Sequence, residues 1–167
     1  MAVVAVKSAQ VTNRDASPRV FNNGRTVAGV KRVVLDQVAI ANGDSVASTY
    51  RIGQIPSRAV VLAVRVTCPD IGTTTTADVG LYRTTADGGA LVDADFFGSA
   101  VSLSGGALTK SDITLESTVV SVANAAKAVW ENLGLATDPS VDYDVVLTLT
   151  GAADAAGNVL VEVEYAI

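Results

Sequence analysis

The chain has 167 residues, of which 49% are hydrophobic and 5% aromatic, and its net charge at pH 7 is −5. This length suits one domain, and an apolar fraction dominated by Val, Ala and Leu favours a β-rich core over disorder. The sequence contains no histidine. That absence excludes the commonest general base and the Ser/His/Asp and Cys/His catalytic systems.

Charge is distributed unevenly along the chain. The first 65 residues carry nine basic and three acidic side chains, whereas the remainder carries three basic and fourteen acidic ones. This division favours head-to-tail contact between copies, or docking of the basic segment on an acidic partner. Direct nucleic-acid binding is not expected, because the basic residues form no dense run and the acidic body would repel phosphate.

Residues 12–29 show neither helical nor strand periodicity and include Pro18, Gly24 and Gly29. This pattern predicts an extended N-terminal arm over residues 1–30, followed by a single domain over residues 31–167. The apolar residues 3–6 fit either a strand added to a neighbouring subunit or a frayed terminus. The predicted partner-binding residues of the arm and its junction are Arg14, Arg19, Arg25, Lys31 and Arg32.

The opening segment lacks the apolar core of a signal peptide, and no apolar run reaches the length of a membrane span. We therefore expect neither export nor membrane insertion. We expect the chain to be synthesised in a reducing cytoplasm. The single cysteine, Cys68, lies in an alternating apolar run, where we expect it to be a small core residue.

Short β-like runs separated by turn residues begin at Lys31. The runs "KRVVLDQVAIA" and "SVASTYRIGQI" flank the turn signal at residues 42–44 and predict a hairpin. The run "RAVVLAVRVTC" is apolar on both faces and predicts a central strand, with Val60, Leu62 and Val64 on one face.

The remaining strands are predicted by alternation. "ADVGLYRT" is one strand, and residues 100–103 and 113–120 are weaker candidates. "YDVVLTLT" and "NVLVEVEYAI" surround a Gly/Ala/Asp loop and predict a closing antiparallel hairpin. About eight short strands indicate an all-β fold, an antiparallel β-sandwich that is most simply jelly-roll-like.

One segment has helical spacing instead. Ala126, Val129, Trp130 and Leu133 follow the apolar pattern of an amphipathic helix, which predicts a helix over about residues 124–133. Asn124 is the expected N-cap and Gly134 follows the expected end. We expect this helix to lie against the sheet, anchored by Trp130.

The stretch "LYRTTADGGALVDADFFGSA" has several interpretations. Its aspartates could hold Ca²⁺, although their spacing is not that of the twelve-residue calcium loop. The structural alternative is a turn at Asp87, a helical cap by Asp93 or Asp95, and a core plug by Phe96 or Phe97. The favoured interpretation is a long inter-strand loop, exposed over residues 84–95, in which Asp87, Asp93 and Asp95 contact a neighbouring subunit.

Other chemistry is weakly supported. The pairs Asp93/Asp95 and Asp142/Asp144 could in principle serve a glycosidase, but the aromatic residues that line such clefts are scarce. We expect Arg83 to pair with Asp78 or Asp87. No enzyme activity, metal or cofactor is predicted.

Several phrases together carry a family resemblance. They are "TNRDASPRVFNN", "NGDSVASTYRIGQIPSRAVV", "ADVGLYRTTADGGALVDADFFGSAVSL", "AKAVWENLGL" and the two closing runs. In these phrases, from about Asn13 to Ile167, the chain resembles small virion structural proteins of tailed bacteriophages, in particular head decoration or cement proteins.

The resemblance implies a non-enzymatic protein of the virion that sits on the capsid exterior, often as a homotrimer, and binds the major capsid protein. It also implies that the protein stabilises contacts between major capsid subunits. Two alternatives remain open: a tail- or fibre-associated virion protein, and a carbohydrate-binding β-sandwich module.

Overall fold

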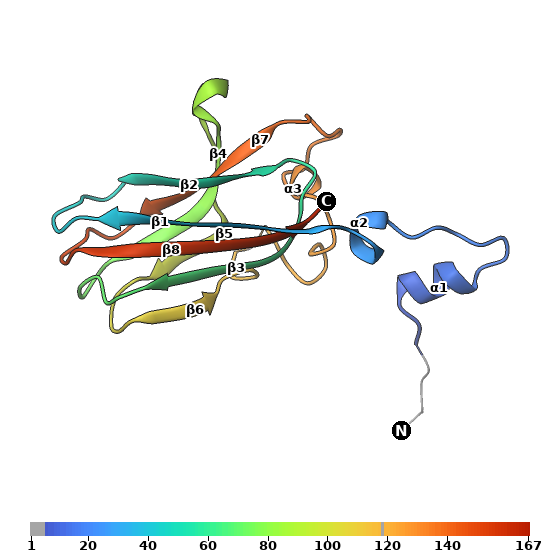
Figure 1. Cartoon of the computed structure of the whole chain (residues 1–167), viewed down its shortest axis with the longest axis horizontal. Coiled ribbons are helices and arrows are strands. Elements are labelled where there is room, and N and C mark those ends of the chain that lie inside the picture. The colour runs from blue at the N-terminus through green and yellow to red at the C-terminus, as the bar shows by residue number, and fades with distance from the viewer. Residues whose placement is uncertain (1–5, 118) are drawn as a thin grey trace.

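The computed structural model describes residues 6–117 and 119–167, and most of the apolar segment over residues 3–6, a candidate strand or frayed terminus, therefore lies outside the described residues. Figure 1 shows a β-sandwich from which an N-terminal segment projects. The helices and strands are α1 (Ala9–Asp15), α2 (Gly24–Val27), β1 (Lys31–Ile40), β2 (Thr49–Pro56), β3 (Val60–Cys68), β4 (Thr76–Arg83), the 3-10 helix η1 (Thr85–Asp87), β5 (Leu91–Ser102), β6 (Leu108–Asp112), α3 (Val129–Asn132), β7 (Asp142–Leu149) and β8 (Gly157–Ala166).

Within these described residues, the strands form two four-stranded antiparallel sheets, ordered β1-β8-β3-β6 and β2-β7-β4-β5. The pairing is nested: β1 pairs with β8, β2 with β7, β3 with β6 and β4 with β5. Such an order arises when one long antiparallel ribbon is wound into two sheets. The prediction of an all-β, antiparallel sandwich is confirmed.

Both predicted hairpins are wrong. The turn after β1 does form, since the Asp44 amide donates to the Ala41 carbonyl oxygen at 3.2 Å. β1 and β2 nevertheless belong to different sheets, and so do β7 and β8. The loops over residues 41–48 and 150–156 thus carry the chain from one sheet to the other. A turn signal specifies a local reversal, whereas the partner of a strand is selected by burial against residues distant in sequence.

β3 lies between β8 and β6, which confirms the central strand. Its faces differ from the predicted alternation, because a register irregularity occurs between Val61 and Ala63. Val61 and Val64 are buried as a result, whereas Leu62 between them is 48% exposed. The irregularity therefore moves one leucine from the predicted apolar face to the surface.

A larger irregularity shapes β5. Val79 pairs with Gly98 and Leu81 with Asp93, so that residues 94–97 lie opposite Gly80 alone. A Cβ atom on Gly80 would collide with the carbonyl oxygens of β5. Glycine at this position lets the two backbones approach closely enough for the bulge to form.

The bulge directs two adjacent aromatic side chains inward. Phe96 and Phe97 are both fully buried and meet edge to face, with ring centroids 4.9 Å apart. This confirms the prediction that the phenylalanines join the segment to the core. The other two candidate strands are corrected: residues 100–102 are the end of β5, and the described residues 113–117, 119 and 120 lie in turns, bends and irregular structure rather than in a strand.

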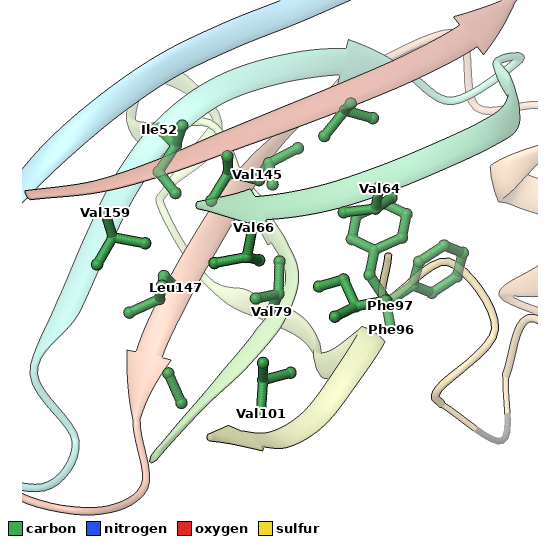
Figure 2. Packing of buried hydrophobic residues seen from close by; sticks show 14 of the residues in the cluster. Ile52, Val64, Val66, Val79, Phe96, Phe97, Val101, Val145, Leu147 and Val159 are labelled. Atoms are coloured by element: carbon green, nitrogen blue, oxygen red, sulfur yellow. The ribbon is translucent and has the colours of Figure 1, made fainter. Parts of the chain in front are cut away.

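The core lies between the two sheets and consists mainly of aliphatic side chains from both inner faces (Figure 2). Cys68 is among the buried residues, as predicted, and burial raises the pKa of its thiol. Close packing of small branched residues accounts for the low aromatic content. The labelled members are Ile52, Val64, Val66, Val79, Phe96, Phe97, Val101, Val145, Leu147 and Val159.

The predicted helix is shorter than expected. α3 covers Val129–Asn132, and Ala128, not Asn124, precedes it. The Ala128 amide donates to the Glu131 carboxylate at 2.8 Å, while Asn124 belongs to a separate turn. Val129 is the buried anchor, 1% exposed, whereas Trp130 is half-buried.

The N-terminal arm is likewise not fully extended. α1 and α2 interrupt it, each with a polar cap: the Ser8 hydroxyl accepts from the Val11 amide, and the Asn23 side chain accepts from the Arg25 amide. Side-chain capping of this kind forms short helices without an apolar face. The hydrophobic pattern of the sequence therefore does not indicate these two helices.

Candidate functional site

The N-terminal segment is ordered mainly by contacts within itself. The Asn13 and Asn22 side chains are hydrogen-bonded at 2.9 Å, and Asn22 also donates to the Gln10 carbonyl oxygen. Neither α1 nor α2 buries a residue. At its junction with the sandwich, the amides of Val30 and Ile167 each donate to the other residue's carbonyl oxygen, at 3.1 and 3.2 Å. Beyond that junction the segment projects from the sheets (Figure 1).

The five predicted cationic residues do not form one cluster. Arg14 pairs with Asp15 and Arg19 lies over the Phe21 ring, both on the projecting part of the chain. Lys31 and Arg32 belong to β1, and Arg25 lines a groove where α2 meets the sandwich. The basic side chains are instead spread along the segment and its junction.

The outer face of the β1-β8-β3-β6 sheet carries a network of ion pairs. Glu164 contacts Lys31 at 2.7 Å and Arg65 at 3.1 Å, while Glu162 contacts Arg65 at 3.5 Å and Lys110 at 3.4 Å. Lys31, followed by Arg65, lowers the pKa of the Glu164 carboxyl. The two carboxylates of β8 are therefore neutralised by cations from β1, β3 and β6.

Exposed apolar side chains surround this network. Val33 is 51% exposed and Leu35 57%, and they lie beside Glu164 and Glu162 in the cross-strand register. Leu62, displaced by the irregularity in β3, is 48% exposed. Exposed apolar residues gathered on one face are typical of a surface that binds another protein. We refer to Val33, Leu35 and Leu62, with the ion pairs between them, as the β1–β3 face.

The outer face of the other sheet is more polar. Arg51 of β2 pairs with Asp144 of β7, and the hydroxyls of Tyr82 and Thr148 lie 3.2 Å apart. Its exposed large apolar residue is Leu91, at the start of β5 and 56% exposed. The two faces of the sandwich thus differ in their suitability for an apolar contact.

Two adjoining hollows lie at one end of the β1–β3 face. The first has a volume of about 430 Å³ and the second about 420 Å³, and they share Leu62 and Ala125. The lining of the first includes Arg25, Val27 and Lys31, whereas the second is lined by Leu115 and by two acidic residues. We call the second hollow the Leu115 groove; its lining residues are Val61, Leu62, Asp112, Thr114, Leu115, Glu116 and Ala125.

The three aspartates predicted to lie in one exposed loop are placed differently. Asp87 lies in η1, where it pairs with Arg83 at 2.8 Å as expected. Asp93 and Asp95 are half-buried residues of β5, which corrects their assignment to the loop or to a helical cap. Burial, followed by the side-chain hydrogen bond with Asp95, raises the pKa of the Asp93 carboxyl.

Arg51 is a structural residue that the sequence did not reveal. Its guanidinium donates to the carbonyl oxygens of Arg83 and Gly89, each at 2.9 Å, and also pairs with Asp144. These contacts hold the turn after β4 on the surface of the β2-β7-β4-β5 sheet. The residues that Arg51 contacts lie between 32 and 93 positions away in the sequence, and no local sequence pattern predicts such contacts.

In the part of the chain that the structure describes, no group of three or more His, Cys, Asp or Glu residues is placed to hold a metal ion. Among the same residues, no helix has the length and apolar character needed to cross a membrane. The exposed features that stand out are the projecting segment, the β1–β3 face and the Leu115 groove.

No family model and no curated protein matches this chain. Among solved structures, it is similar to a chain of the cyanophage Pam1 capsid asymmetric unit, with 20% identity over 99% of both chains and a TM-score of 0.50. It is also similar to a chain of the acid-stable capsid of Helicobacter pylori bacteriophage KHP30, with 19% identity, 83% of this chain and 94% of that chain covered, and a TM-score of 0.39. At such identities the likeness concerns the fold alone.

Proposed function

We propose that this chain is a non-enzymatic structural protein of a bacteriophage virion, and specifically a decoration protein bound to the outside of the capsid. The observation that carries the proposal is its likeness, over nearly the whole of both chains, to a chain of the Pam1 capsid asymmetric unit. The match spans both the sandwich and the N-terminal segment, because 99% of this chain is covered. Its partner is then the major capsid protein.

The β1–β3 face is the surface that we assign to the shell. Val33 and Leu35 would lose water on docking, while the carboxylates of β8 are already paired with cations from neighbouring strands. Internal pairing lowers the cost of covering these charges with another protein, since neither carboxylate is left as an isolated charge. An apolar contact area with its charges satisfied is a suitable docking surface.

The function requires binding and no chemical step. Each copy bridges adjacent capsid subunits, and we propose that copies associate as trimers at threefold positions. Contacts that are individually modest become strong when three linked copies bind to a symmetric lattice, because the second and third contacts form at high effective concentration. The decoration layer thereby resists expansion of the shell.

Co-sedimentation with capsids that lack this protein tests the proposal. Full-length chain is expected to pellet with the capsids, and Leu35→Asp is expected to reduce the bound fraction by about tenfold or more, as for a central contact residue. The matched control is Leu91→Asp, which places the same charge at a similarly exposed leucine on the other sheet. An equal loss of capsid binding in both variants would mean that the β1–β3 face is not the surface that docks on the shell.

A deletion of residues 1–29 separates the contributions of arm and sandwich, because it retains the hydrogen bonds between Val30 and Ile167. Undiminished capsid binding by this variant would show that the arm does not contact the shell. Failure of the full-length chain to bind capsids, together with reproducible binding to sugars on a glycan array, would overturn the capsid role altogether.

A further inference from the structure

An exposed aromatic side chain lies in the connection between α1 and α2. Phe21 is 87% exposed, and the adjacent Val20 is 49% exposed. The guanidinium of Arg19 lies 6.0 Å from the centre of the Phe21 ring, so the two form a compact basic and aromatic pair. This connection belongs to the part of the chain that projects away from the sheets (Figure 1). An aromatic ring left in water at such a position is a candidate anchor for a contact with another molecule.

The Leu115 groove has the complementary character. Leu62 and Leu115 are each about half exposed and supply an apolar lining, with Val61 and Ala125 beside them. Asp112 and Glu116 add two negative charges to this lining. Hydrogen bonds from Thr114 lower the pKa of the Asp112 carboxyl, which therefore remains ionised at neutral pH.

Arg65 lies opposite Asp112 in the pairing of β3 with β6 and helps to lower the pKa of the Asp112 carboxyl, but its ion pairs are made with other residues. Arg65 is held by Glu162 and Glu164, at 3.5 and 3.1 Å. Glu116 is exposed. The groove thus presents an apolar lining with acidic residues, and the projecting connection presents an aromatic ring with a basic residue.

We propose that Phe21 of one copy inserts into the Leu115 groove of a second copy, with Arg19 beside Glu116. The occupant is a second copy because this chain itself supplies the matching charge and the unburied ring. Phe21 does not fill the groove of its own chain, since its side chain is 87% exposed. A groove of about 420 Å³ has room for a phenyl ring, whose burial removes on the order of 150–250 Å² from water.

The contact joins two different surfaces, so it is heterologous and can close into a ring when repeated. This contact would form the interface of the trimer that the proposed function includes. The inference therefore rests on that proposed association of copies. It does not depend on shell binding, because the Phe21 contact forms between isolated copies. Self-association and capsid binding can therefore fail separately.

Mixed disulfide formation tests the contact directly. Phe21→Cys and Leu115→Cys chains, mixed in equal amounts and oxidised, are expected to give a cross-linked heterodimer. The native Cys68 is the one cysteine of the chain and is only 4% exposed. The wild-type chain therefore serves as the background control for oxidation. A mixture of Phe21→Cys with Leu91→Cys is expected to give none. Absence of the first product, or a dominant Phe21→Cys homodimer, would overturn the proposal.

Sedimentation equilibrium of the full chain supplies the second test. Wild type is expected to exceed the 17.0 kDa monomer mass, and Phe21→Ala to weaken self-association by about tenfold or more. Arg19→Glu and Glu116→Arg are each expected to weaken it, and their combination in one chain to restore it. A monomeric wild type, unchanged association of Phe21→Ala, or failure of the combined variant to recover would contradict the contact.

Discussion

The guanidinium of Arg51 and the carbonyl oxygen of Gly89 are joined by a hydrogen bond of 2.9 Å, although 38 positions separate the two residues in the chain. Gly89 has φ of +65°, and a Cβ atom there would lie 3.2 Å from the same guanidinium. Strand β2 thus determines the position of the turn between β4 and β5, and it does so through one side chain.

Replacement of Arg51 should loosen that turn. Arg51→Ala removes hydrogen bonds to two carbonyl oxygens and the pairing with Asp144, and we expect a loss of about 1–2 kcal/mol in the free energy of unfolding. Hydrogen exchange should accelerate at the Gly89 amide, which donates to the Thr84 carbonyl oxygen. Arg58→Ala, at an exposed arginine, is the control; equal effects of both variants would contradict this role of Arg51.

The bulge in β5 makes a second prediction. Gly80→Ala would place a methyl group against the carbonyl oxygens of Asp93 and Ala94, and we expect it to destabilise the fold by about 1–3 kcal/mol. Urea denaturation measures the change. Gly24→Ala is the matched control, because a Cβ atom there meets nothing within 4 Å and alanine suits a helix. If Gly80→Ala leaves the stability to urea unchanged, the bulge tolerates a side chain at this position.

The raised pKa of Asp93 predicts a pH-dependent effect of opposite sign to that of carboxylates with a lowered pKa, such as Asp154. Its folded-state pKa lies above the unfolded value of 3.8, so ionisation at neutral pH costs stability, and this cost disappears when both states are protonated. Asp93→Asn should therefore raise the urea midpoint at pH 7 and leave it nearly unchanged below pH 3.8. A variant that is destabilised at pH 7 would contradict this.

Asp154 should behave in the reverse manner. Its carboxylate accepts from the Thr73 amide at 2.9 Å and from the Thr73 hydroxyl at 2.6 Å, and these bonds lower its pKa. The stabilisation is fully present above pH 3.8, the unfolded-state pKa, and is lost as the pH falls through the lower pKa of the folded state. Asp154→Asn should lower Tm at pH 7, with the difference from wild type shrinking towards pH 2. Asp142→Asn, at an exposed aspartate, should show neither effect.

Much of the fold was predictable from local patterns. Alternating apolar residues identified β3, β4, β7 and β8, and the two phenylalanines of β5 were assigned correctly to the core. The pairing of Arg83 with Asp87 was also expected, since four residues of chain keep the two within reach. These features depend on neighbours in the sequence.

The candidate site was less predictable. Asp93 and Asp95 resembled loop residues because glycines precede them, but backbone pairing with β4 makes them part of a strand. Leu62 resembled a core residue until the irregularity in β3 placed it at the surface. The arm's short helices have no apolar face, so hydrophobic periodicity could not reveal them.

The sequence by itself determined the alternation of buried and exposed positions, the places where the chain turns, and the absence of histidine chemistry. Only the tertiary structure decided which sheet each strand joins, because a turn signal is the same for a hairpin and for a crossing between sheets. The crossings bring β1, β8 and β3 side by side and create the β1–β3 face. That surface exists only through pairings between distant segments, whose stability comes from burial that no local pattern measures.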